Sequence, residues 1–136
     1  MPVPLVPTKV QRPPSPGDLI PRHRLVDRLH VGLDRKLTLI SAMAGMGKTT
    51  LMAQSLEQCP RRSAWLSLDE RDNDVVVFVS DLIAAVRTVW PDACEETLSL
   101  LRGAEAPPLR AITASLVDGL SDVVSSLERT AAPRTA

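Results

Sequence analysis

Aromatic residues are almost absent from this chain of 136 residues, which has no tyrosine, one phenylalanine and two tryptophans. Any hydrophobic core must therefore be built mainly from aliphatic side chains. The two cysteines, Cys59 and Cys94, have neither the spacing of a metal site nor that of a disulfide framework. We therefore expect reduced thiols in a cytoplasmic protein.

An excess of one charge and long apolar runs are also missing. The 16 basic and 16 acidic residues give a formal net charge of zero, which argues against a general nucleic-acid-binding surface. No run approaches the roughly 18 apolar residues that indicate a membrane-spanning helix. The first seven residues are too rich in proline for the apolar centre of a signal peptide. These absences predict that the chain contacts neither a membrane nor nucleic acid directly.

The most informative segment is the run Ser-Ala-Met-Ala-Gly-Met-Gly-Lys-Thr-Thr at residues 41–50, which follows the apolar run 37–40. It matches the phosphate-binding pattern Gly-x-x-x-x-Gly-Lys-[Ser/Thr], except that alanine stands in place of the first glycine. The pattern requires a strand before the loop and a helix after it, and an accidental Gly-Lys-Thr would lack that context. The sequence therefore predicts a nucleotide-binding loop made of Ala42, Met43, Ala44, Gly45, Met46, Gly47, Lys48, Thr49 and Thr50.

Each residue type in this loop suits a negatively charged ligand. Gly45 and Gly47 can adopt positive φ without steric cost, so that backbone N–H groups can surround phosphate oxygens. Lys48 would reach the β- and γ-phosphates from the start of a helix, whose positive dipole end also attracts anions. Thr49 would give its hydroxyl to Mg²⁺, and Thr50 would lie nearer the α-phosphate. We expect ATP or ADP with Mg²⁺ as the ligand.

Composition divides the chain into three parts. Residues 1–21 contain seven of the twelve prolines and should be extended unless they dock on something. Residues 22–128 carry the regular hydrophobic patterns and form a partial nucleotide-binding domain. Residues 129–136 form a short tail of small and polar residues.

Alternating strand and helix patterns predict an α/β fold. Residues 36–41 and 63–68 have strand composition, and helices are expected at 24–33, 48–58, 94–101 and about 108–127. Residues 75–90 combine β-branched composition with helical spacing, and a helix is favoured because Asp74 would cap it. The order implies an incomplete parallel sheet of two strands with several helices.

Nucleotide hydrolysis normally needs a second motif, in which an acidic residue follows an apolar strand. Asp69 follows the predicted strand 63–68 and is one candidate for ordering Mg²⁺. The plainer interpretation, which we favour, is that Asp69, Asp72 and Asp74 form a solvated turn that caps a helix. The basic pair Arg61-Arg62 is interpreted as surface charge.

Several segments together resemble the N-terminal part of the MalT-type transcription regulators of the LuxR family, which are STAND-class P-loop ATPases. The resembling segments are Thr8–Val10, Leu19–Leu29, Leu37–Ala42, Ala44–Gly45, Gly47–Leu51, Ala64–Asp74 and Phe78. The family also has alanine at position 42, whereas it usually has proline at 43 and an aromatic residue at 46, where this chain has methionines. The pair Pro21-Arg22 resembles a motif that lies near the nucleotide base, with proline in place of the usual glycine.

The resemblance implies a chain that stops before the acidic strand of the ATPase domain, the helical effector-sensing repeats and the DNA-binding helix-turn-helix. We therefore expect nucleotide binding without hydrolysis or DNA binding by this chain alone, and self-association is left open. Two alternatives remain at this point. One is a small stand-alone NTPase or kinase that uses Asp69, and the other is a gene remnant without function.

Overall fold

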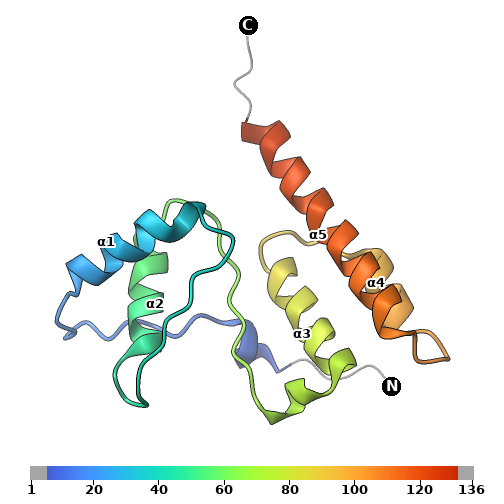
Figure 1. The fold of residues 1–136 in the computed structure, drawn as a ribbon, viewed down its shortest axis with the longest axis horizontal. Helices are drawn as coiled ribbons and strands as arrows, with labels where there is room; N and C mark the ends of the chain where they lie inside the picture. Colours follow the sequence, from blue (N-terminus) through green and yellow to red (C-terminus); the bar gives the residue numbers. More distant parts are fainter. Residues whose placement is uncertain (1–5, 132–136) are drawn as a thin grey trace, which may run out of the picture. The chain divides into compact units, whose positions relative to one another are not determined.

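A computed structural model of the chain describes residues 6–131. Its elements, in chain order, are the 3-10 helix η1 (Pro7–Val10), α1 (His23–Val31), η2 (Gly32–Asp34), α2 (Lys48–Glu57), η3 (Glu70–Asn73), α3 (Val75–Arg87), α4 (Glu95–Leu101) and α5 (Leu109–Ala131), as Figure 1 shows. They form two compact units. The three-helix unit joins the residues up to Gln11 to those from Ala64 onward, and the loop unit comprises Arg12–Ser63.

The predicted α/β fold is wrong, because the part of the chain that the structure describes contains no β-strand. Both segments with strand composition, 36–41 and 63–68, lack regular structure. Leu37 and Leu39 are 82% and 84% exposed, so the apolar run in which they lie is not buried. Strand composition is only a preference, and a strand forms only where a neighbour pairs with its backbone groups. Neither segment has such a ladder.

In the loop unit, α1 and α2 pack against each other and confirm the two helices predicted there. Val26 of α1 is 1% exposed, and Leu51 and Ala53 of α2 are also buried. His30 in α1 lies with its Nε2 atom 2.9 Å from the backbone oxygen of Ser55. Arg61, predicted as surface charge, donates to the Leu33 carbonyl and pairs with the exposed Asp34.

In the three-helix unit, α3 begins where the predicted cap stands. The Asp74 carboxylate accepts hydrogen bonds from the backbone N–H groups of Val76 and Val77, at 2.8 and 3.1 Å. This cap satisfies two N–H groups that a helix start leaves unpaired. Burial of Val79 and Ile83 on one face then outweighs the strand preference of the valine run. The helix favoured for this segment is confirmed.

The helices α3, α4 and α5 share one aliphatic core. Its buried members are Val79, Ile83, Ala93, Cys94 and Ile112. Gly119 of α5 leaves no room for a side chain beside the start of α4, because a Cβ atom on it would lie 2.9 Å from Cys94 Sγ. Cys94 itself has a φ of 56°, a conformation that is rare outside glycine. As expected for a chain so poor in aromatics, all these buried side chains are small or aliphatic.

None of the described helices is both long and apolar enough to cross a membrane.

Candidate functional site

The predicted phosphate loop lies in the loop unit, between residues 36–41, which lack regular structure, and α2. Gly45 and Gly47 both have a φ of 79°, in the left-handed region that residues with a Cβ rarely adopt. Around them, Ala42, Met43, Ala44 and Met46 are exposed. The glycines thus shape a turn that leaves the backbone of the loop open to a ligand.

Helix α2 starts directly from this turn. Gly47 is its N-cap residue, and no side chain caps the helix there. The first amide groups of a helix lack partners within the helix, and they carry the positive end of its dipole. Lys48, Thr49 and Thr50 form the first turn, with Thr49 exposed. This end of α2 therefore presents N–H groups and positive potential next to the loop.

Lys48 folds back across the loop that precedes it. Its Nζ atom donates hydrogen bonds to the Ala42 oxygen at 2.7 Å and to the Met43 oxygen at 3.0 Å. Both acceptors are backbone carbonyls, so no carboxylate neutralises the ammonium in these contacts. A cation held only by neutral oxygens keeps its attraction for an anion.

Arg22 brings a second cation to the same loop. Its Nη1 atom donates to the Met46 oxygen at 3.1 Å, and its guanidinium lies 3.6 Å from where a Cβ on Gly47 would be. Beside it lies a cavity of about 330 Å³, lined among others by Asp18, Thr50 and Gln54. The sequence pointed to Arg22 only through its resemblance to a motif near the nucleotide base, and the contact with Met46 was not foreseen.

The possible hydrolytic residue, Asp69, belongs to the three-helix unit. Its carboxylate accepts hydrogen bonds from the backbone N–H of Arg71 and from the Arg71 side chain, each at 2.9 Å. These two bonds, the side-chain bond first, lower the pKa of Asp69 to about 2. Asp69 and Asp72 also form a reciprocal cap on η3. The interpretation of this turn as a capping structure is therefore confirmed, but the expectation that it is solvated is wrong for Asp72, whose side chain is only 6% exposed.

A cation that the sequence pattern did not indicate lies at the centre of that turn. Lys9 is only 5% exposed, and its Nζ atom donates to both oxygens of Asp72 and to Asp81. Burial opposes the ammonium, but the hydrogen bonds to the two carboxylates outweigh it and raise the pKa of Lys9. The bond from Lys9, followed by that from the Asp69 backbone, lowers the pKa of Asp72. The resemblance included Thr8–Val10, but nothing in the residue pattern indicated burial there.

No group of three or more His, Cys, Asp or Glu side chains among the described residues is arranged to hold a metal ion. The assignment of Thr49 to Mg²⁺ therefore rests on its place in the loop motif and stays a prediction.

Curated relatives match almost the whole chain. It is 37% identical over 126 residues to the serine/threonine-protein kinase PknK of Mycobacterium tuberculosis, which is 90% of this chain and 11% of that protein. The PknK of Mycobacterium bovis matches equally. The chain is also 35% identical over 119 residues to the HTH-type transcriptional regulator MalT of Yersinia pestis, which is 87% of this chain and 13% of MalT. No protein-family profile matches the chain. No solved structure does either.

These similarities confirm that the chain is related to MalT, as its residues predicted, and add a kinase that was not predicted. The chain spans only 11% to 13% of the length of the relatives it matches. Because the two matches cover 90% and 87% of the chain, they overlap over most of it. The same segment is thus shared by two proteins whose names describe different activities.

Proposed function

We propose that the chain is the nucleotide-binding segment of a MalT-like regulator, in which residues 42–50 bind the phosphates of ATP or ADP together with Mg²⁺. The observation that carries this proposal is the position of Lys48, whose ammonium lies on the loop carbonyls of Ala42 and Met43 at the start of an uncapped helix. Positive φ at both loop glycines supports it, since a phosphate-binding loop needs its N–H groups turned toward the ligand.

Each loop residue has a role in this proposal. The ammonium of Lys48 leaves the two carbonyls and contacts the β- and γ-phosphates. The hydroxyl of Thr49 would serve as a ligand for Mg²⁺, which would neutralise part of the phosphate charge. The backbone around Gly45 and Gly47 and the first turn of α2 supply N–H donors.

The two kinds of relative also support nucleotide binding, and not the separate activity of either relative, as the function of this shared segment. A segment common to a kinase and a transcription regulator is best explained by a function that both can use, and ATP binding is such a function. The proposal assigns protein phosphorylation and DNA binding to the parts of PknK and MalT that this chain does not match. The family assignment to the STAND-class ATPases belongs to the same proposal.

Hydrolysis by this chain alone is not part of the proposal. Asp69, the candidate for ordering Mg²⁺, already pairs with Arg71 and lies 3.6 Å from the ammonium of Lys9. Its lowered pKa reflects those bonds to the protein. A stand-alone NTPase or kinase based on Asp69 is therefore disfavoured by the structure.

The test is a titration of the full chain with a fluorescent ATP analogue in the presence of Mg²⁺. Lys48→Ala should weaken binding about tenfold or more, because a charge-assisted contact to phosphate is lost. Lys36→Ala is the matched control, since Lys36 is an exposed lysine of the same unit, and it should bind within about twofold of the wild type. Equal affinity of the wild type and the Lys48 variant would overturn the proposal, as would no affinity of the wild type.

A further inference from the structure

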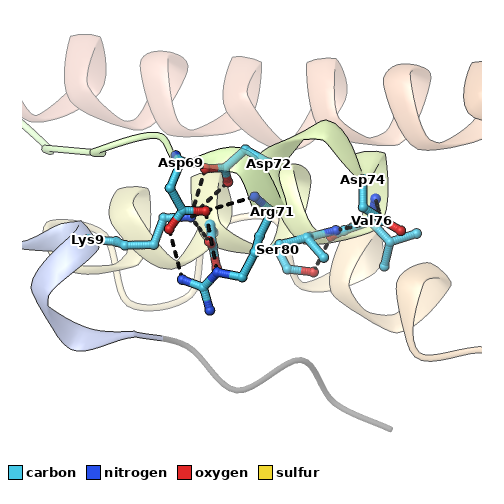
Figure 2. A network of polar contacts seen from close by, with 9 residues as sticks. Lys9, Asp69, Arg71, Asp72, Asp74, Val76 and Ser80 are labelled. Carbon is cyan, nitrogen blue, oxygen red and sulfur yellow. Dashed lines mark hydrogen bonds and ion pairs between the residues drawn. The ribbon is translucent and has the colours of Figure 1, made fainter.

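Lys9 is a buried cation surrounded by carboxylates. Its Nζ atom lies 2.6 Å from Asp81, 2.8 Å from Asp72 and 3.6 Å from Asp69. The side chains of Lys9, Asp72 and Asp81 are each exposed by no more than 6%. Figure 2 shows Lys9, Asp69 and Asp72 turned toward one another. Buried ions are tolerated only when they are paired, so this arrangement ties η1 firmly to η3 and α3.

The position of Lys9 in the chain gives this contact a second consequence. The loop unit begins at Arg12, just after Lys9, and ends at Ser63, just before Ser67. The backbone N–H of Ser67 donates to the Lys9 oxygen at 2.8 Å. Lys9 therefore joins the two segments that connect residues 12–63 to the three-helix unit. It lies on the first segment, and its carbonyl accepts from Ser67 on the second. Its ammonium contacts the turn that follows Ser67.

We propose that Lys9 is a conformational clasp that closes residues 12–63 into a loop tied at both ends to the three-helix unit. Holding the two ends of a long segment together removes chain entropy from that segment, so a contact at its base restricts the whole segment. The proposal goes beyond nucleotide binding, because it concerns the connections of the loop unit and is independent of any ligand.

The carboxylates make the clasp cooperative. Asp72 accepts from Lys9 and also from the backbone N–H of Asp69, at 2.6 Å, in the cap of η3. Loss of the Lys9 ammonium leaves Asp72 and Asp81 as buried charges without their cation, which favours opening of the whole turn. The clasp should therefore open as one unit, together with the bond from Ser67.

A first test needs no substitution. The chain has three lysines, of which Lys36 is exposed and Lys9 is 5% exposed. Brief labelling with an amine-reactive reagent, followed by mass spectrometry, should modify Lys9 at least about tenfold more slowly than Lys36, because an ion-paired buried ammonium reacts only after local opening. Equal rates at the two lysines would overturn the clasp.

The second test measures amide hydrogen exchange at Ser67. In Lys9→Met the exchange of this N–H should accelerate at least about tenfold relative to the wild type, whereas Lys36→Met should change it by less than about twofold. If the Lys9 variant fails to fold, Asp81→Asn replaces it, because it removes one carboxylate charge and keeps the shape of the side chain. Unchanged exchange at Ser67 in the variant that folds would overturn the proposal. Neither measurement uses nucleotide, so a failure of ATP binding leaves both results intact.

Discussion

The two units of the molecule differ in how they are held together. The three-helix unit has a continuous aliphatic core in which Val79, Ile83 and Ile112 are almost fully buried. In the loop unit the buried apolar residues among those described are Val26, Leu51 and Ala53, while Leu37 and Leu39 are more than 80% exposed. The candidate ligand site lies in the unit with the smaller core. Binding segments are often drawn from the least stable part of a protein, because they must adapt to a ligand.

The chain carries separate reporters for the two units. Both tryptophans, Trp65 and Trp90, belong to the three-helix unit, and both histidines, His23 and His30, belong to the loop unit. Tryptophan fluorescence therefore follows unfolding of the three-helix unit, and the proton signals of the histidine rings follow unfolding of the loop unit. The difference in stability between the units can be measured on the intact chain.

The largest effect is expected from Ile83→Ala in the three-helix unit. Ile83 is 0% exposed at the centre of the core, so the substitution leaves a cavity that neighbouring helices fill only in part. The free energy of unfolding should fall by about 4 kcal/mol. Urea unfolding followed by tryptophan fluorescence gives the value. A loss below about 1 kcal/mol would contradict a core that stabilises this unit.

A smaller effect is expected from Leu51→Ala in the loop unit. Leu51 is 7% exposed and has few buried neighbours in that unit, so the site can collapse or admit water. The loss should be about 2 kcal/mol, at the low end for such a truncation. It is measured from amide exchange in α1 and α2 and from the histidine signals. A cost equal to that of Ile83→Ala would remove the proposed difference between the units.

The loop glycines should give an effect of about 1 kcal/mol each. Gly45 and Gly47 share a φ of 79°, and a Cβ on Gly45 would meet nothing within 4 Å. Gly45→Ala therefore measures backbone strain alone, and Gly47→Ala adds only an ordinary contact with Arg22 at 3.6 Å. Amide exchange in α2 should report similar losses for both variants. A much larger loss for Gly47→Ala would show that Arg22 leaves no room for a side chain.

The smallest effect is expected from acid in the three-helix unit, because the Asp69 side chain is 44% exposed and solvent weakens its ion pairs. The pKa of Asp69 is about 2, below the value of about 3.9 for an unfolded chain, and the pKa of Asp72 is also lowered. Their contribution is thus complete above about pH 4 and is lost as the pH falls toward 2. The urea midpoint from tryptophan fluorescence should decrease in that window. Asp69→Asn should reduce this decrease, and an unchanged pH profile in the variant would contradict the assignment.

Local signals explain which parts of the fold could be predicted. Asp74 before the valine run and the glycines before Lys48 act within a few residues, so the starts of α3 and α2 were visible in the sequence. The prediction of strands at 36–41 and 63–68 was wrong, because a strand needs a neighbouring strand to pair with and composition does not reveal one. The contacts of Lys9 with Asp72 and Asp81 join residues far apart in the chain, and they could not be predicted from a single sequence.

For the candidate site, the loop motif predicted which residues lie together, because a contiguous segment forms the site. The left-handed glycines and the lysine at the start of α2 follow from the motif itself. The contact of Arg22 with Met46 depends on how the chain before α1 folds over the loop, so only the resemblance pointed toward it.

For the proposed phosphate ligand, the contacts of Lys48 with the Ala42 and Met43 carbonyls would set a threshold for anion selectivity. A ligand gains this ammonium only by replacing two hydrogen bonds that the loop already makes. A small monovalent anion such as chloride offers one weak contact in return, whereas a polyphosphate offers several charged oxygens at once. The loop should therefore discriminate among anions by the number of oxygens they present, and common buffer salts should compete poorly for it.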